Sequence, residues 1–186
     1  MASVFSLYKK SSIIISSVLT CIVLFVLSSV ALCKLFYPVC YIDEVKVYSK
    51  KYEIDPYLVL AIINTESGFD RLATSNRGAL GLMQIMPSTA EAIASDLDFV
   101  GFKTEDLYNP NVNIEFGCYY ILYLSDKFDS IEKVLFAYNA GEGTLQRFLN
   151  DNNGEFLVNN IQINETRNFI YKVEKAYNHY KRWCKV

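Results

Sequence analysis

Hydrophobic residues recur along this chain at the three- and four-residue spacing of amphipathic helices, and alternating strand-like patterns are rare. The pattern predicts helices over residues 43–54, 56–66, 87–97, 111–128, 129–140, 144–151 and 164–183. A short extended piece is predicted over residues 155–163, "EFLVNNIQI". The chain is therefore expected to be mainly α, with one compact domain and an N-terminal appendage.

Local signals mark the ends of several of these helices. Asp55-Pro56 and Asn109-Pro110 each place a capping side chain before a proline, which is the pattern of a helix start. Gly141 ends an apolar helix in the manner of a C-terminal glycine. Residues 67–81, "SGFDRLATSNRGALG", contain three glycines and predict a long loop.

The appendage is an uncharged, apolar stretch over residues 11–33. As a helix it would be roughly 35 Å long, enough for a hydrocarbon core of about 30 Å. Lys9 and Lys10 precede it, which predicts a cytoplasmic N-terminus over residues 1–10 and export of the remainder. We assign residues 11–36 as a transmembrane anchor or a long signal sequence, 37–42 as a linker and 43–186 as the domain. Length favours the anchor, whereas "SVA" at residues 29–31 offers a signal cleavage site that would make the domain secreted.

Charge and cysteine content narrow the function classes. All 20 acidic residues lie at or after Asp43, against 15 Lys and Arg, so the exported part carries about −5 and has no basic run. This composition argues against a nucleic-acid partner. Cys40, Cys118 and Cys184 lie beyond the appendage and cannot all pair with one another, so buried free thiols are expected rather than a disulfide framework. One histidine supports no zinc site, and neither a metal nor a cofactor is expected.

Glu66 is the first candidate for chemistry. At helical spacing it continues the apolar face of Val59, Ile62 and Ile63. If that face is buried, desolvation disfavours the charged carboxylate, and a carboxyl that keeps its proton near neutral pH can act as a general acid. The alternative is that Glu66 lies in an exposed last helical turn and points to water.

A second candidate is the loop over residues 75–90, "SNRGALGLMQIMPSTA". Met83, Ile85 and Met86 surround Gln84, which places an amide within adaptable apolar surface. Such a surface suits an N-acetylated sugar, although a core loop with gap-filling methionines is equally compatible. In "AYNAG", Tyr138 and Asn139 precede a glycine and can line a cleft, or only pack and cap.

These segments, in this order, resemble the soluble lytic transglycosylase family, whose members have a goose-type-lysozyme-like fold and cut peptidoglycan. The segments are "ESGF" at 66–69, "GALGLMQIMPSTA" at 78–90, "NPNVNIEFGCYYILYL" at 109–124, "AYNAG" at 137–141 and "ETRNFIYKV" at 165–173. The resemblance covers roughly residues 43–180. It implies a lysozyme-like helical domain preceded by one N-terminal transmembrane helix.

The resemblance also implies a mechanism. Glu66 would be the single acid/base that cleaves the β-1,4 bond between N-acetylmuramic acid and N-acetylglucosamine and closes a 1,6-anhydro ring on the muramic residue, without water. Six residues match family positions that orient this glutamate or contact the glycan: Ser67, Ser75, Met83, Gln84, Tyr138 and Asn139. The implied partner is the peptidoglycan glycan strand, with the anchored domain facing the cell wall.

The chain departs from the family pattern near the end of the domain. The family commonly has a tyrosine where this chain has Phe169, and that tyrosine's hydroxyl reaches the catalytic glutamate. Phe169 keeps the ring and lacks the donor. Tyr171 should point to another side of the helix and is a poor substitute. Gln162 and Ile163 replace the usual proline-aromatic pair, and Arg71 replaces a common proline.

Three other readings remain open at this stage. A goose-type muramidase would hydrolyse the same bond with water. A peptidoglycan-binding protein with weakened catalysis is suggested by Phe169 alone. A plain structural membrane protein would not require the ordered set of motifs.

Overall fold

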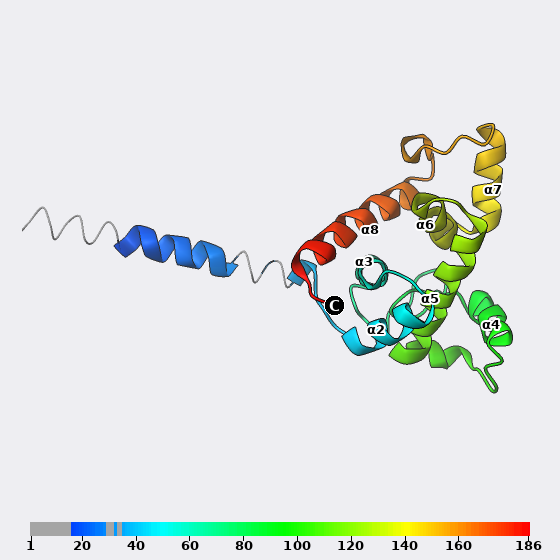
Figure 1. The fold of residues 1–186 in the computed structure, drawn as a ribbon, viewed down its shortest axis with the longest axis horizontal. Coiled ribbons are helices and arrows are strands. Elements are labelled where there is room, and N and C mark those ends of the chain that lie inside the picture. Colours follow the sequence, from blue (N-terminus) through cyan, green and yellow to red (C-terminus); the bar gives the residue numbers. More distant parts are fainter. Residues whose placement is uncertain (1–15, 29–31, 33–34) are drawn as a thin grey trace, which may run out of the picture. The chain divides into compact units, whose positions relative to one another are not determined.

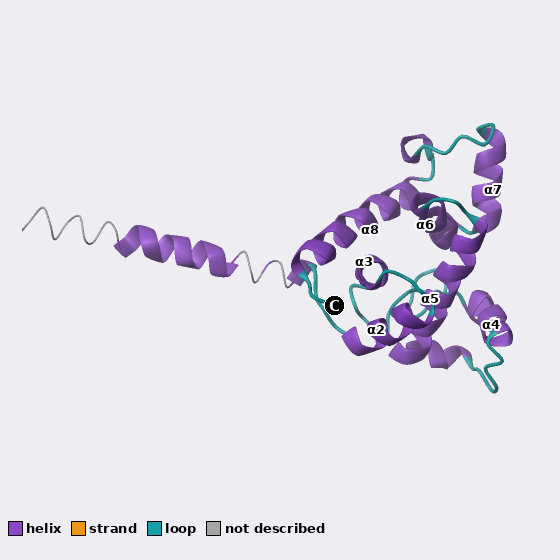
Figure 2. Ribbon diagram, in the orientation of Figure 1, coloured by secondary structure: helices purple, strands orange, loops and turns teal. Residues whose placement is uncertain are grey.

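The computed structural model describes residues 16–28, 32 and 35–186, and the described residues are helices joined by loops (Figure 2). The chain divides into two compact units, Met1–Pro38 and Val39–Val186. The first unit contains a helix over residues 16–28. In the described part of the chain, no helix combines the length and the apolar character needed to cross a membrane. The predicted anchor spans residues 11–36, of which 11–15, 29–31 and 33–34 lie outside the described residues.

The second unit is built from α-helices and two short 3-10 helices. In chain order these are α2 (Ile42–Lys51), α3 (Pro56–Glu66), α4 (Pro87–Asp96), η1 (Thr104–Tyr108), α5 (Pro110–Lys127), α6 (Ile131–Ala140), α7 (Glu142–Asp151), η2 (Val158–Asn160) and α8 (Asn164–Trp183). The described residues form no named strand, and the only β-type pairings among them are two isolated bridges at Leu80. The mainly helical class is confirmed.

The predicted helix starts are confirmed by their hydrogen bonds. The Asp55 carboxylate accepts from the backbone N–H of Tyr57 at 2.9 Å and thereby caps α3. The Asn109 side chain accepts from the backbone N–H of Asn111 at 3.0 Å and caps α5. Gly141 ends α6 with φ of 86°, a conformation that favours glycine. These local interactions explain why α3 and α5 begin, and α6 ends, where they do.

Helix α3 forms the centre of this unit. Five consecutive residues, from Val59 to Ile63, are fully buried. In Figure 1, α3 is seen nearly end-on, with α2 and α8 around it, and both helices contact it. α8 presents Phe169, Ile170 and Val173 among its buried residues. A helix that is enclosed in this way holds the residues at its C-terminal end in a fixed position.

Three predicted features need correction. The extended piece expected over residues 155–163 is wrong, since this segment contains η2 and no strand. Ile161 is fully buried whereas Leu157 is 49% exposed, and the described residues contain no strand that could pair with the segment. α7 begins directly after Gly141 and is longer than expected, and η1 was not predicted. Of the cysteines expected to be buried, Cys118 is buried, Cys184 is half-buried and Cys40 is exposed, so the prediction is wrong for Cys40.

Candidate active site

A buried asparagine fixes the loop that follows α3. The Asn113 side chain on α5 donates to the carbonyl oxygens of Leu80 at 2.9 Å and Leu107 at 2.8 Å. Its Oδ1 accepts from the backbone N–H of Met83 at 2.7 Å. Gly81 lies directly against this group, because a Cβ at that position would overlap the Leu107 carbonyl and the Asn113 amide. The glycine and the asparagine together hold the loop close to α5.

Gln84 occupies a left-handed backbone conformation, with φ of 48°. Its Nε2 donates to the carbonyl oxygens of Gly81 at 2.9 Å and Ala73 at 3.2 Å. Both donors of the amide group are therefore engaged by the loop, and no other described residue donates to its Oε1. Oε1 of the Gln84 side chain is therefore able to accept a hydrogen bond from a ligand, such as one donated by the N–H of an acetamido group.

Two predicted site residues, Ser67 and Met83, hold the loop in place through contacts within the protein. The Ser67 hydroxyl donates to the Leu82 carbonyl oxygen at 2.8 Å, which ties the end of α3 to the loop. Met83 is fully buried, and a Cβ at Gly117 of α5 would overlap its sulfur. Neither Ser67 nor Met83 lines the cavity described below. Any contact of the Met83 side chain with a sugar would require the loop to move.

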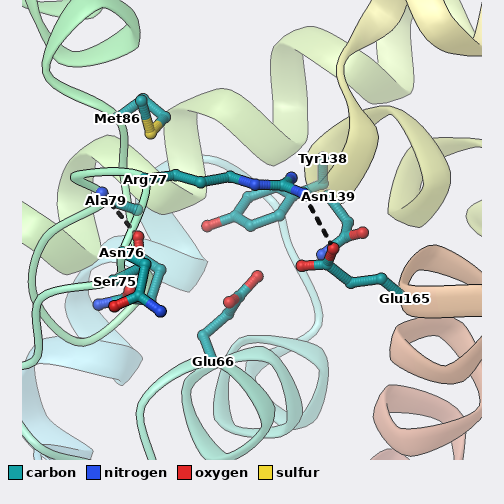
Figure 3. A pocket seen from close by; sticks show the side chains of 10 residues that line it. Glu66, Ser75, Asn76, Arg77, Ala79, Met86, Tyr138, Asn139 and Glu165 are labelled. Carbon is teal, nitrogen blue, oxygen red and sulfur yellow. Dashed lines mark hydrogen bonds and ion pairs between the residues drawn. The ribbon is translucent and has the colours of Figure 1, made fainter.

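A cavity of about 420 Å³ lies over the end of α3. Its lining residues are Glu66, Ser75, Asn76, Arg77, Ala79, Gln84, Met86, Tyr138, Asn139 and Glu165. They come from the end of α3, the following loop, the end of α6 and the start of α8. Five predicted residues, Glu66, Ser75, Gln84, Tyr138 and Asn139, therefore lie around one space, as Figure 3 shows for all of them except Gln84.

Glu66 is the acid at the base of this cavity. Burial raises the pKa of its carboxyl from 4.5 to about 8, and the negative charge of Glu165 adds to the effect. No described residue forms a hydrogen bond with the Glu66 carboxyl. With neither a donor nor a cation in contact to stabilise the carboxylate, the carboxyl keeps its proton at neutral pH and is able to act as a general acid.

Tyr138, which lines the cavity, stacks against Phe169 of α8. The two rings are parallel within 2°, with centroids 6.4 Å apart. The Tyr138 hydroxyl donates to the Met83 carbonyl oxygen at 2.7 Å, and burial raises the pKa of Tyr138 well above 10. Tyr171 is 43% exposed and donates to Asn159, so the prediction that it does not replace the missing hydroxyl of Phe169 is confirmed.

Asn139 and Ser75 line the cavity, and the side chain of each forms one hydrogen bond within the protein. Oδ1 of Asn139 accepts from the Thr166 hydroxyl at 2.9 Å, so its amide donors are available to a ligand. The Ser75 hydroxyl oxygen accepts from the backbone N–H of Ala79 at 2.9 Å and closes the turn that begins the loop. These hydrogen bonds hold the two side chains in place, so their remaining donors and acceptors are suited to a ligand with hydroxyl and amide groups, such as an N-acetylated sugar.

Sequence reasoning missed two charged residues of the site, Arg77 and Glu165. Nη2 of Arg77 lies 3.2 Å from Oε2 of Glu165, and the two form an ion pair between the loop and α8. Glu165 is the first residue of the segment "ETRNFIYKV", and its position in that motif could have identified it as a site residue. Arg77 is a single basic residue in a loop, and only the fold brings it to a carboxylate 88 positions away.

Comparison with sequence families agrees with this geometry. Residues 43–159 match the family described as "Transglycosylase SLT domain". The chain is 32% identical over 166 residues to membrane-bound lytic murein transglycosylase C of Glaesserella parasuis, a match that covers 76% of this chain and 46% of the relative. It is 32% identical over 154 residues to soluble lytic murein transglycosylase of Escherichia coli, with 79% of this chain and 24% of the relative covered. The chain thus spans about half, or less, of the length of these relatives.

Solved structures give the same result for the fold. The 70 kDa soluble lytic transglycosylase of Escherichia coli superposes with a TM-score of 0.71 at 33% identity, covering 79% of this chain and 25% of that one. An inactive Glu-to-Gln mutant of the lytic transglycosylase Slt from Pseudomonas aeruginosa gives a TM-score of 0.74 at 27% identity, covering 81% and 25%. A complex of the 70 kDa enzyme with bulgecin A gives 0.73 at 31% identity, covering 80% and 25%.

Proposed function

The chain belongs to the transglycosylase SLT domain family, and on that premise we propose that it is a peptidoglycan lytic transglycosylase with Glu66 as its single acid/base. The observation that carries the proposal is a carboxyl whose pKa is raised by burial to about 8 and which lies in a cavity with amide and hydroxyl groups. The inactive Glu-to-Gln mutant of the Pseudomonas aeruginosa relative supports a role for one glutamate in that protein.

In the proposed reaction, protonated Glu66 gives its proton to the glycosidic oxygen between N-acetylmuramic acid and N-acetylglucosamine. The bond from that oxygen to C1 of the muramic residue breaks, and positive charge develops at C1. The C6 hydroxyl of the same residue then attacks C1 while the Glu66 carboxylate takes the hydroxyl proton. The products are an N-acetylglucosamine end and a 1,6-anhydro-muramic end, and Glu66 is protonated again. One carboxyl suffices because no water has to be activated.

The predicted substrate-binding residues have distinct roles in this proposal. Gln84 accepts and Asn139 donates hydrogen bonds to the acetamido and hydroxyl groups, and the aromatic side chain of Tyr138 forms part of the wall. Ser75 lines the cavity beside them. Ser67 and Met83 keep the loop in place, since their contacts in the structure are with the protein itself.

We also propose that the N-terminal segment holds the domain at the membrane, with the N-terminus inside and the catalytic unit facing the cell wall. The uncharged, apolar stretch over residues 11–33 and the "membrane-bound" name of the Glaesserella parasuis relative support this proposal. If the segment is cleaved, the same domain is released toward the wall.

A goose-type muramidase is the second candidate, and Glu165 is the observation that favours it. A hydrolase that activates water uses a second carboxylate, and Glu165 lines the same cavity as Glu66. In the structure Glu165 is paired with Arg77, and a carboxylate is a weaker base for as long as a cation lies beside it. A binding protein with weakened catalysis is the third candidate.

The test is product analysis on purified sacculi. Wild type should release muropeptides with 1,6-anhydro ends, and Glu66→Gln should lower the rate by at least about 100-fold, because it removes the general acid. Glu91→Gln, in an exposed acid of α4, is the control and should leave the rate unchanged. Reducing ends without anhydro ends would identify a muramidase. Binding to sacculi without any lysis by wild type would favour the third candidate.

A further inference from the structure

The ion pair between Arg77 and Glu165 joins two walls of the cavity that contains Glu66. Arg77 lies in the loop between α3 and α4, and Glu165 lies in the first turn of α8. In Figure 3, Arg77 extends toward Glu165, and Glu66 rises from α3 beneath them in this view. A glycan strand that enters the cavity must therefore meet this pair near the acid.

The pair is open to solvent. The Arg77 side chain is 77% exposed and the Glu165 side chain is 63% exposed. Exposed ion pairs are weak because water solvates both charges when they separate. A ligand with a suitably placed charge is therefore able to replace one partner without disrupting the fold.

The charges around the cavity decide which ligand can replace a partner of the Arg77–Glu165 ion pair. Its titratable or charged lining residues are Glu66 from α3, Arg77 from the loop, Tyr138 from α6 and Glu165 from α8. None of the described residues that line the cavity comes from α2 or α5. Arg77 is the one cation in this set, so an entering carboxylate has only Arg77 to pair with. A neutral sugar offers no competitor for Glu165.

We propose that a carboxylate on the lactyl arm of a muramic residue displaces Glu165 from Arg77, and that the released Glu165 then favours the protonated form of Glu66. This inference rests on the peptidoglycan substrate proposed above. In such a glycan each muramic residue carries a lactyl group, whose carboxyl is either free or extended by a peptide with its own carboxylates. N-acetylglucosamine has no lactyl group. Arg77 is thus a specificity residue and Glu165 a positioning residue.

The physical basis is the interaction of like charges. An ionised Glu165 disfavours ionisation of Glu66, and it does so in the structure, where Glu165 is paired with Arg77. The charge of Glu165 is the largest contribution after burial to the raised pKa of Glu66. A bound carboxylate that occupies Arg77 leaves Glu165 without its cation and adds a second negative charge to the cavity, so Glu66 holds its proton more firmly when the correct sugar is present.

The first arm of the test follows the Glu66 carboxyl by ¹³C NMR in the full chain labelled at glutamate, with Glu66→Gln used to assign the signal. Glu165→Gln should lower the pKa of Glu66 by about one, and Arg77→Ala should raise it by a similar amount. Arg77→Lys should keep the pKa near the wild-type value because the cation is retained. Equal pKa values in all four proteins would overturn the coupling.

The second arm adds N-acetylmuramic acid, muramoyl dipeptide or N-acetylglucosamine to the wild type and to Arg77→Ala. The first two probes should raise the pKa of Glu66 in the wild type and have no effect in Arg77→Ala. A response to N-acetylmuramic acid assigns the lactyl carboxylate, and a response to muramoyl dipeptide alone assigns the peptide carboxylate. The same response to N-acetylglucosamine, or no response to any probe, would overturn recognition by Arg77.

These titrations require no turnover, so the two proposals can fail separately. A chain that titrates as expected but lyses no sacculi would overturn the proposed function and leave the coupling intact. A chain that lyses sacculi with anhydro products, but whose Glu66 ignores Arg77 and Glu165, would overturn only the present inference.

Discussion

The carboxyl of Glu66 binds its proton more tightly in the folded protein than in the unfolded chain. Its pKa rises from 4.5 to about 8 on folding, chiefly because of burial. Below pH 4.5 the carboxyl is protonated in both states and folding costs nothing extra. As the pH rises from about 4.5 to about 8, the unfolded chain releases this proton and the folded protein does not, so the free energy of unfolding decreases.

Replacing Glu66 with Gln should remove this loss. At pH 8 we expect Glu66→Gln to be more stable than wild type by about 4 kcal/mol, and at pH 4 we expect little difference. Urea unfolding at several pH values measures the effect, with Glu91→Gln as an exposed control. A difference that is equal at pH 4 and pH 8 would show that the change acts through packing and not through the proton.

Phe169 offers a second test at a single residue. It is 6% exposed and parallel to Tyr138. It lacks the hydroxyl that the resemblance to the family led us to expect near Glu66. Phe169→Tyr should add a donor to the Glu66 carboxylate, which favours the charged form. A hydrogen bond to a charged group is worth roughly 1.5 kcal/mol, or about one pKa unit. The alkaline limb of the pH–rate profile should therefore move down by about one pH unit.

Tyr171→Phe is the matched control for this substitution. Tyr171 lies on the same helix but is exposed, and its hydroxyl donates to Asn159 outside the cavity. Its loss should leave the profile in place. An unchanged profile in Phe169→Tyr would mean that a hydroxyl at this position does not reach Glu66 in this chain.

At the scale of elements, close contact between α5 and the loop after α3 holds the wall of the site. Gly117 of α5 lies against the buried side chain of Met83, and a Cβ there would overlap the Met83 sulfur and methyl group. Gly117→Ala should therefore lower the free energy of unfolding by about 1–3 kcal/mol despite the better helix propensity of alanine. Activity should fall as well, because a shift of Met83 would also move the next residue, Gln84, which lines the cavity.

Gly143 gives the opposite result and is the control. It is a helical glycine of α7 with no atom within 4 Å of an added Cβ. Gly143→Ala should raise the free energy of unfolding by about 0.5 kcal/mol, since alanine restricts the unfolded chain. Urea denaturation of both variants measures the pair. A neutral Gly117→Ala would show that the loop adjusts freely, contrary to a fixed wall.

The elements also show why some features were predictable and others were not. The starts of α3 and α5 were found because Asp55 and Asn109 bond to backbone groups two residues away. The loop geometry was not predicted, because Asn113 joins it to groups as far as 33 residues away in sequence. The error over residues 155–163 has a similar cause. Local hydrophobicity suggested a strand, but a strand needs a partner that only the fold supplies.

The site follows the same division. The candidate residues of the loop and of "AYNAG" could be identified from short motifs, and five of the seven predicted residues line one cavity with Glu66 among them. Ser67 and Met83 have the same kind of local signal, yet their side chains bond or pack within the protein. Whether the side chain of a loop residue faces the cavity or the protein interior depends on how the loop packs against α5. Arg77 acquires its partner only through the fold.

At the scale of the whole molecule, the described helices of the site all belong to the unit Val39–Val186. Three of the four segments that line the cavity are anchored within that unit, the loop by Asn113, α3 by its cap and α8 by its buried face. The described residues that line the cavity, from Glu66 to Glu165, all lie within this unit.

A chain truncated to residues 39–186 should consequently fold and act on its own. We expect its free energy of unfolding to match that of the full chain within about 0.5 kcal/mol, because the buried hydrophobic residues of the described chain, from Val45 to Tyr180, are all retained. Its rate on purified sacculi should also be unchanged. In cells, the full chain should fractionate with membranes if residues 11–36 anchor it, and the truncated chain, given a cleavable export signal, should not. A truncated chain that unfolds or loses lysis of isolated sacculi would show that the first unit supports the catalytic one. A full chain found free of the membrane would instead indicate cleavage of the N-terminal segment.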